Sequence, residues 1–481
     1  WLDDIAAVGD SEACNRAQTW LLEWVSKFGM GKGLGWNPDL TGRRLTCWIN
    51  HSIFIKNALP KNSVDLFHHS LALQTVFLSR RWQQVSTGVA RLEALCGLVC
   101  AGYSLVGMDH LGATSLKILE TECVAQITSD GTLLSRNPEE LLKVFGLLIQ
   151  IKITLNLAEV QIPEPVLNRI SKMVPILRSL RHGDGTLARF HGGSLGSEYF
   201  LDQTLAASEV RPSIPQENAM GFARFTSGST TVIVDAAAPN SGPDSFNAHA
   251  STCAFELSTG RTPLIVSCGS GSSFGDNFHL AGRCTASHST MTIEGVNSSW
   301  FSKCAQRHLS YLQDVPKIVK VQKTRAIDGV RLRINHNGYQ GSHGLMHVRT
   351  LDLPVDGSGL IGEDELYPPN KKDVKQFDKM REQYSGELKY AIQFHIHPDV
   401  HTSLATGGSA VLLTFRNGDF WVLRHDGSSI LSIEESVYFD DKLLRPRTTS
   451  QIVLSGKIKE FTTRVGWSLA KSVEKTQEAI Q

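Results

Sequence analysis

The stretch FARFTSGSTTVIVD, residues 222–235, decides the fold of the second half of this 481-residue chain. Its residues follow a period of two on either side of Ser227 and Gly228, which predicts a β-hairpin that turns at this pair. Such spacing continues and predicts large antiparallel sheets stacked as a sandwich. The further predicted strands are 253–257, 263–268, 290–294, 330–336, 344–351, 389–397, 410–415, 419–425, 431–438 and 449–455.

Before this hairpin the pattern is helical up to about residue 180. Trp20, Leu21, Trp24, Val25 and Phe28 recur at the spacing of one helix face. The helices come in consecutive pairs with short Gly, Asp, Asn or Pro linkers, which favours stacked helical hairpins such as an α/α toroid. The predicted helices are 13–28, 63–82, 91–105, 112–127, 138–157 and 165–180.

The length exceeds what one hydrophobic core usually serves, so two domains are expected. We predict an α+β multidomain fold: an incomplete N-terminal α/α toroid over residues 1–205 and an antiparallel β-sandwich over residues 206–481. The chain begins at Trp1 with residues of helical character, so we expect its natural N-terminus to lie upstream. Residues 356–379, with six acidic residues among Gly, Pro and Lys, are predicted to form a surface loop.

Composition narrows the function classes. Hydrophobic residues make up 41% and charged residues 20%, and the net charge is only +1, so no global field favours nucleic acid. No apolar run reaches the roughly 18 residues of a membrane span. The nine cysteines include no Cys-x-x-Cys pair, which argues against a disulfide framework or a zinc knuckle.

Six strings occur in an order that resembles the heparinase II/III family of polysaccharide lyases, and the resemblance runs through most of the chain. They are GRRLTCWIN (42–50), ECVAQITSDG (122–131), RHGDGTLARFH (181–191), HASTCAFEL (249–257), RTPLIVSCG (261–269) and ASHST (286–290). The resemblance implies a toroid followed by a sandwich, and β-elimination at a uronic acid. It also implies a bacterial periplasmic or cell-envelope protein; no signal peptide is visible, and a cytoplasmic location stays open.

The sequence departs from the family pattern at the positions that carry the chemistry. In the family a base removes the C5 proton, neutral donors or a cation stabilise the charge that develops on the uronate, and a Tyr or His protonates the leaving oxygen. Only the second His of the sheet motif and the last metal ligand are kept, as His249 and His288. The departures are Val89 and Ala90 for Asn-His, Glu140 for Tyr, Asn247 for the first His, and Ser267 for the metal-binding Asp.

The Gly-rich turn at residues 181–193 offers replacement groups where the two predicted domains meet. His182 or His191 can act as a base near neutral pH. Arg181 or Arg189 can hold a uronate carboxylate in a bidentate pair. The alternative is a turn braced by internal salt bridges.

Three further groups complete the set of candidates. Asn50 and His51 are predicted to bind substrate, or else to cap a helix C-terminus. Glu140 and Asn247 join His182 and His191 as catalytic candidates, although an ionised Glu140 only accepts protons. His249 and His288 can hold one divalent metal, Zn²⁺ or Ca²⁺, or can be core histidines satisfied by hydrogen bonds.

The sequence therefore predicts a polysaccharide-lyase-like protein that cleaves an acidic, uronate-containing glycan by β-elimination. One alternative is a catalytically silent relative that binds glycan or assists assembly of an envelope polysaccharide. Another is a hydrolase that uses Glu140 with a second carboxylate. The expected partner is an acidic polysaccharide or oligosaccharide, with no nucleic acid, and the sequence leaves the oligomeric state open.

Overall fold

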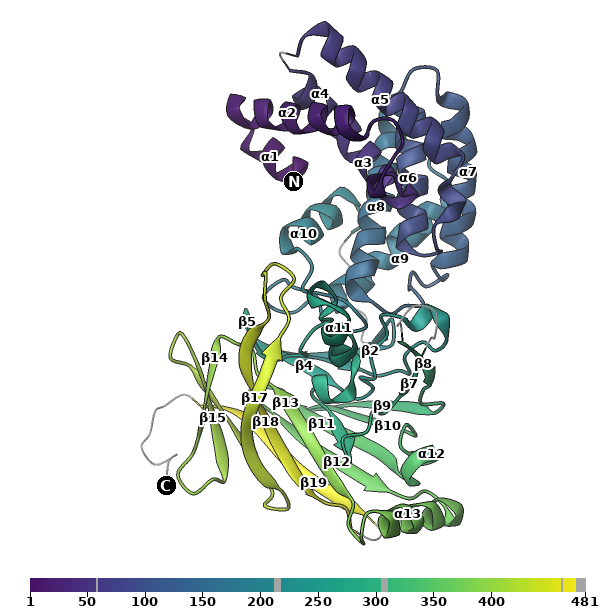
Figure 1. The fold of residues 1–481 in the computed structure, drawn as a ribbon. Coiled ribbons are helices and arrows are strands. Elements are labelled where there is room, and N and C mark those ends of the chain that lie inside the picture. The colour runs from purple at the N-terminus through teal and green to yellow at the C-terminus, as the bar shows by residue number, and fades with distance from the viewer. Residues whose placement is uncertain (58, 212–217, 304–309, 460–461, 473–481) are drawn as a thin grey trace. The chain divides into compact units, whose positions relative to one another are not determined.

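The computed structural model describes residues 1–57, 59–211, 218–303, 310–459 and 462–472, which divide into two units (Figure 1). The helical unit comprises Trp1–Leu133, Glu140–Val174 and Asp202–Arg211. The sheet unit comprises Leu134–Glu139, Pro175–Leu201 and Pro212–Gln481. The predicted order, a helical toroid region followed by an antiparallel β-sandwich, is confirmed.

Ten α-helices occur in the described residues up to residue 211. The predicted helix 138–157 coincides with helix α8, and the other predicted helices differ from the observed ones by a few residues at their ends. The helices are α1 (Leu2–Val8), α2 (Ser11–Phe28), α3 (Pro38–Asn50), α4 (Ser52–Lys56), α5 (Lys61–Ser79), α6 (Val89–Ser104), α7 (Asp109–Gln126), α8 (Pro138–Leu157), α9 (Glu164–Ser179) and α10 (Glu198–Ala207).

Small residues let helices α3 and α6 cross closely. Gly42 lies against the backbone of Glu93 and Ala94, and a methyl group at Gly97 would overlap the backbone of Gly42. Around this crossing, apolar side chains from α2, α3, α5 and α6 form one buried cluster that includes Leu45 and Leu98. The helical unit is therefore held by a tightly packed helix pair with an apolar core beside it.

The sandwich is built from two layers of antiparallel sheet. One layer is an eight-stranded sheet in the order β14-β15-β16-β19-β12-β11-β10-β9. The other contains the five-stranded sheet β1-β2-β3-β4-β5 and the four-stranded sheet β17-β18-β13-β6, joined by a bridge between Ile265 and Ile396. A single buried apolar cluster, with Phe255, Phe394 and Trp467 among its members, takes side chains from all three sheets.

The strand bounds agree with the predicted alternation in most of this region. The strands are β1 (Asn218–Ala219), β2 (Phe222–Ser227), β3 (Thr230–Asp235), β4 (Phe255–Thr259), β5 (Thr262–Ile265), β6 (Met291–Ile293), β7 (Trp300–Lys303), β8 (Ser310–Asp314), β9 (Val319–Ala326), β10 (Gly329–His336), β11 (Met346–Pro354), β12 (Gly359–Tyr367), β13 (Lys389–His395), β14 (Val400–Leu404), β15 (Ala410–Phe415), β16 (Phe420–His425), β17 (Ile430–Tyr438), β18 (Arg447–Lys457) and β19 (Thr463–Ser472). Helices α11 (Asp276–Arg283), α12 (Gln340–His343) and α13 (Lys371–Gln383) lie between strands.

The predicted surface loop at 356–379 is wrong. Strand β12 occupies most of its first half, in the interior of the eight-stranded sheet, and helix α13 begins at Lys371. The acidic residues misled the prediction because one of them, Asp364, is fully buried and ion-paired with Arg349. The strands β1, β7, β8, β9, β14 and β19 were also not predicted.

No helix among the described residues is both long and apolar enough to cross a membrane. This agrees with the sequence, in which the longest apolar stretches are interrupted by polar residues.

Candidate functional site

A buried ion pair anchors the predicted site inside the sheet unit. Asp235 ends strand β3, and its Oδ1 accepts a hydrogen bond of 2.5 Å from Arg136 Nη2. Arg136 also donates to the backbone carbonyls of Met220, Gly221 and Ala237, so its guanidinium is fully engaged. Burial opposes ionisation of Asp235, but Arg136 outweighs it and holds the pKa of this carboxyl well below its usual range.

His191, a predicted base, has a hydrogen bond on Nδ1 and a carboxylate near Nε2. Its Nε2 lies 3.3 Å from Asp235 Oδ2, and its Nδ1 accepts the backbone N–H of His249 at 3.1 Å. The neutral ring therefore carries its proton on Nε2, and its one lone pair, on Nδ1, is already used. Burial lowers the pKa of His191, so the neutral form is favoured.

His249 is held in the same way by the turn that carries His191. Its Nε2 accepts the backbone N–H of Gly192 at 2.8 Å, which places the proton on Nδ1, a buried atom without a hydrogen-bond partner. Gly192 has φ +88°, and a side chain there would meet Asn247. Burial lowers the pKa of His249 well below its ordinary value, with the neighbouring His288 adding to the effect.

Asn247 is the accessible member of this group. It is partly exposed, whereas His191, His249 and His288 are at most 1% exposed. Within the described residues no hydrogen bond holds its side-chain amide. Of the groups predicted around His249, Asn247 is thus the one whose polar atoms are available to a ligand.

His249 and His288, the predicted metal ligands, have ring centroids 4.9 Å apart. His288 Nδ1 is 3.2 Å from the hydroxyl of Ser267, and burial lowers the pKa of His288 to about 3. Zn²⁺ takes at least three protein ligands, but the lone pair of His249 Nε2 is already occupied and Ser267 supplies no carboxylate. These donors therefore do not fit a metal ion. The predicted metal site stays a prediction, and no catalytic step is assigned to a metal.

His182 and Arg189 are tied to a buried carboxylate, Glu256. His182 Nε2 lies 3.1 Å from Glu256 Oε2, and its Nδ1 lies 3.1 Å from the hydroxyl of Ser258. Glu256 also accepts the backbone N–H groups of Arg189 and Ser267. Burial opposes ionisation of Glu256, but the bonds to His182 outweigh it and lower the pKa.

The Arg189 side chain faces backbone rather than open space. Its guanidinium donates to the carbonyls of Ser267, Cys268 and Phe439 and lies 4.0 Å above the ring of Tyr438. The cavity beside it, lined also by His182 and Glu256, has a volume of about 20 Å³. That volume suits a water molecule and excludes a sugar ring.

The remaining predicted residues lie at more exposed positions. Arg181 donates to the carbonyl of Gly185 and lies 3.6 Å from Glu198 within the sheet unit. In the helical unit, the side chain of Asn50, the last residue of α3, accepts from Gln150, and His51 Nε2 is 2.7 Å from Asp3. Glu140 lies partly buried in the first turn of α8. His51 is the C-cap residue of α3, as the capping alternative expected.

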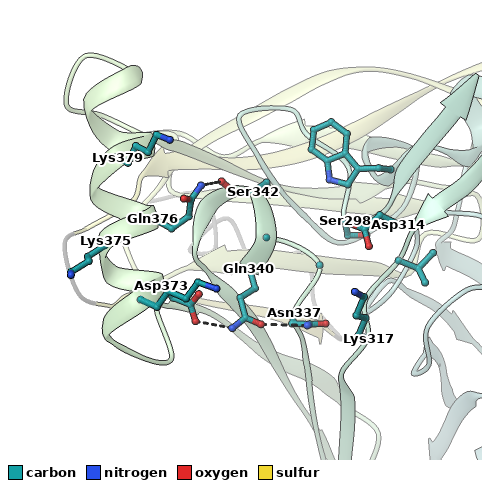
Figure 2. A pocket seen from close by; sticks show the side chains of 15 residues that line it. Ser298, Asp314, Lys317, Asn337, Gln340, Ser342, Asp373, Lys375, Gln376 and Lys379 are labelled. Atoms are coloured by element: carbon teal, nitrogen blue, oxygen red, sulfur yellow. Dashed lines mark hydrogen bonds between the residues drawn. The ribbon is translucent and has the colours of Figure 1, made fainter.

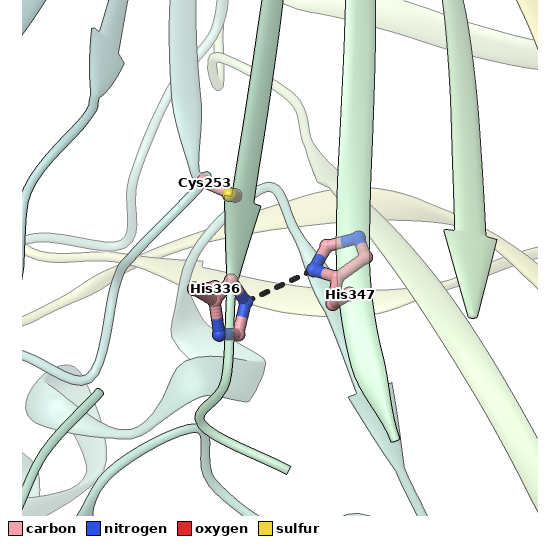
Figure 3. A group of neighbouring side chains, drawn as sticks. All are labelled: Cys253, His336 and His347. Carbon is pink, nitrogen blue, oxygen red and sulfur yellow. Dashed lines mark hydrogen bonds between the residues drawn. The ribbon is translucent and has the colours of Figure 1, made fainter. Parts of the chain in front are cut away.

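The sequence did not single out a second buried cluster, at Cys253, His336 and His347 (Figure 3). A ligand atom of each residue lies within 4.8 Å of those of the other two. Gly338 N–H donates to His336 Nδ1 at 3.1 Å, so His336 Nε2 carries the proton and donates to His347 Nδ1 at 3.0 Å. His347 Nε2 in turn donates to Asp364 at 2.7 Å.

This cluster is a chain of hydrogen bonds with fixed tautomers. Asp364 also accepts from Arg349 and from Trp467 Nε1, and Arg349 outweighs the effect of burial to hold the pKa of Asp364 well below its usual range. To bind a metal here, His336 would have to lose its Nε2 proton, because its other ring nitrogen, Nδ1, already accepts the N–H of Gly338. The cluster therefore links strands β10, β11 and β12 structurally, through His336, His347 and Asp364. The sequence signal, two histidines inside apolar strands, does not separate this role from metal binding.

Known proteins share both sequence and fold with this chain. Residues 210–468 match the family model described as "Heparinase II/III-like, C-terminal". FtsZ-localized protein C from Caulobacter vibrioides is 29% identical over 478 residues, which cover 98% of this chain and 80% of the relative.

Two solved structures extend the comparison to the whole chain. Heparan sulfate lyase HepC from Pedobacter heparinus is 16% identical, with 99% of this chain and 76% of that chain covered and a TM-score of 0.62. Heparinase III is 14% identical, with 98% and 75% covered and a TM-score of 0.70. At such identities the likeness shows the fold alone.

Proposed function

Because the chain belongs to the heparinase II/III-like family, we propose that this polysaccharide-lyase-like protein binds an acidic glycan without cleaving it by β-elimination. The observation that carries the proposal is the bonding of the buried histidines. Elimination requires a base whose lone pair reaches the C5 proton of the uronate. In His191 and His249 that lone pair already accepts a backbone N–H.

The other groups of the predicted machinery support the same proposal. Both ring nitrogens of His182 have buried partners, and Arg189 spends its guanidinium on carbonyl groups. Glu140 replaces the family's Tyr and, when ionised, has no proton to give to a leaving oxygen. The accessible amide of Asn247 suits binding to a carboxylate or hydroxyl group, since it can both donate and accept.

An elimination assay combined with a retention assay tests this proposal. The protein is incubated with a panel of uronate polysaccharides while the ultraviolet absorbance of unsaturated uronate is recorded, with a known lyase as positive control. The same polysaccharides are immobilised, and retention is compared with that on neutral dextran. We expect a flat absorbance trace and salt-sensitive retention on at least one acidic glycan.

Other outcomes would redirect the assignment. A rise in absorbance that scales with protein concentration and disappears in His191→Ala would establish a lyase and overturn the proposal that the protein does not cleave its glycan. New reducing ends without absorbance, lost in Glu140→Gln, would point to hydrolysis. Absence of retention on every acidic glycan would remove the binding role.

The relative from Caulobacter vibrioides bears a name that states localisation by FtsZ. We propose on that basis that this chain too gathers where FtsZ gathers. A fluorescent fusion imaged together with labelled FtsZ tests it. Co-localised bands are expected, and a uniform distribution along the cell envelope would instead favour the predicted periplasmic or envelope location.

A further inference from the structure

A second site lies in the sheet unit and shares no residue with the histidine cluster. It is a cavity of about 900 Å³ bounded by helix α13, the loop around Gln340 and the segment from Asp314 to Lys317. Figure 2 shows Lys379 on α13 at one side, Lys317 at the other, and Gln340 between them. The volume suits an oligosaccharide segment.

The wall charges of this cavity are mainly positive. Lys372, Lys375 and Lys379 follow one another three and four residues apart and therefore share a face of α13. Lys317 adds a fourth ammonium group to the lining. Within the described part of the chain, none of these four ammonium groups has an ion-pair partner. Mutual repulsion at this site is relieved when an anion binds.

Two carboxylates, Asp314 and Asp373, also line the cavity, and they do not balance the four lysines. Asp373 is only 6% exposed, and its Oδ2 accepts from Gln340 at 2.7 Å and from Asn370 at 2.5 Å. Asn337 donates to Gln340 Oε1 at 3.3 Å. These bonds orient the Gln340 amide toward Asp373 and leave its second N–H for a ligand. The floor thus presents fixed polar groups beneath a basic wall.

Trp300 supplies an apolar surface on the same cavity. It is 48% exposed, so its indole ring is available to a ligand. The faces of pyranose rings carry C–H groups that pack against indole rings. An aromatic surface, amide donors and ammonium groups in one cavity together match a charged sugar better than a bare phosphate.

We propose that this lysine pocket binds a short segment of an acidic glycan through its sulfate or carboxylate groups. The proposal rests on the proposed function and gives that function a site. The ammonium groups of Lys317 and Lys379 pair with anionic substituents, Gln340 contacts hydroxyl groups, and Trp300 packs against a ring face. A nucleic acid duplex is disfavoured because the whole chain carries a net charge of only +1.

Charge reversal on both sides of the pocket tests the proposal. Binding of a sulfated uronate tetrasaccharide is measured by titration calorimetry for the wild-type protein and for Lys317→Glu/Lys379→Glu. The matched control, Lys371→Glu/Lys442→Glu, makes the same change in net charge at exposed lysines outside the pocket. We expect a loss of affinity of about tenfold or more in the pocket variant and of less than about threefold in the control.

Trp300→Ala provides an independent readout, because it changes no charge. It is expected to weaken tetrasaccharide binding while leaving the salt dependence of the affinity unchanged. Circular dichroism of each variant verifies the fold. Equal binding by wild type and pocket variant would overturn the pocket while leaving glycan binding intact. If binding depends on the lysines and the glycan is also cleaved by elimination, the pocket assignment would stand, and the proposal that the protein does not cleave its glycan would be wrong. Tighter, lysine-dependent binding of an oligonucleotide would overturn the glycan assignment.

Discussion

At the scale of single residues, hydrogen bonds to the ring nitrogens are the reason for our proposal that the histidines of the site do not act as bases. Backbone N–H groups of His249 and Gly192 fix the tautomers of His191 and His249, and Asp235 faces the proton of His191. The negative charge of Asp235 also compensates the buried guanidinium of Arg136. One carboxylate therefore contacts both the turn at residues 190–193, through His191, and the segment before helix α8, through Arg136.

Asp235→Asn is expected to lower the free energy of unfolding by about 3–5 kcal/mol, because it leaves the buried Arg136 without a counter-charge. Urea unfolding followed by tryptophan fluorescence measures the change. The control is Asp352→Asn, which removes the same group from an exposed pair with Arg331 and should cost about 1 kcal/mol or less. Similar losses in both variants would show that the Asp235 pair adds no more than a surface ion pair.

At the scale of elements, close contacts without side chains set the packing of the helical unit. Helices α3 and α6 approach through Gly42 and Gly97, and helices α6 and α7 approach through Gly102 and Gly112. Such approaches give helix pairs their fixed crossing because any added group must displace backbone. The helical unit therefore tolerates little change along these two lines of contact.

Gly97→Ala is expected to destabilise the protein by about 1–3 kcal/mol, since its methyl group would overlap the backbone of Gly42. Thermal unfolding monitored by far-ultraviolet circular dichroism gives the shift. Gly341→Ala serves as the control, because that glycine is helical and has open space around it. Its substitution should be neutral or stabilising by up to about 1 kcal/mol. An unchanged transition in Gly97→Ala would contradict the close crossing.

The accuracy of the predictions made from the sequence also differs between elements. Periodicity predicted helix α8 and most strands. The lysine pocket could not be predicted, because the acidic run before α13 looked like a loop. The sequence predicted that Arg189 binds a carboxylate. Its actual partners are backbone carbonyls, which the pattern of side chains does not reveal. The placement of His336 against His347 depends on strand register, which the sequence alone did not give.

Across the whole molecule, buried histidines gather in the sheet unit. His191, His249, His288, His336 and His347 are at most 1% exposed, and burial lowers the pKa of each. The unfolded chain takes up protons on these rings below about pH 6.5, whereas the folded chain does not until the pH approaches the lowered pKa. The free energy of unfolding therefore has its full value above about pH 6.5 and falls as the pH decreases below that value.

The free energy of unfolding is therefore expected to decline from pH 6.5 toward pH 4, and a histidine that stays neutral over this range, as His288 does, contributes about 1.4 kcal/mol per pH unit. Urea unfolding midpoints across this range measure the slope. His288→Gln should flatten the slope by up to one histidine's share, because the pKa of His288 is about 3 in the folded protein. His110→Gln, at an exposed position, should leave it unchanged. A slope unaffected by His288→Gln would argue against a neutral buried ring.

Strand β9 forms one border of the eight-stranded sheet, with one side of its backbone left without a neighbouring strand in the described sheet. Its exposed residues include Lys320 and Arg325, and Lys323 lies between them. Cationic side chains along such a border repel a second copy that would add its own strand there. We therefore expect these side chains to oppose fibril-like self-association, so that replacing them with threonine or valine makes concentrated solutions prone to aggregation, measured by light scattering.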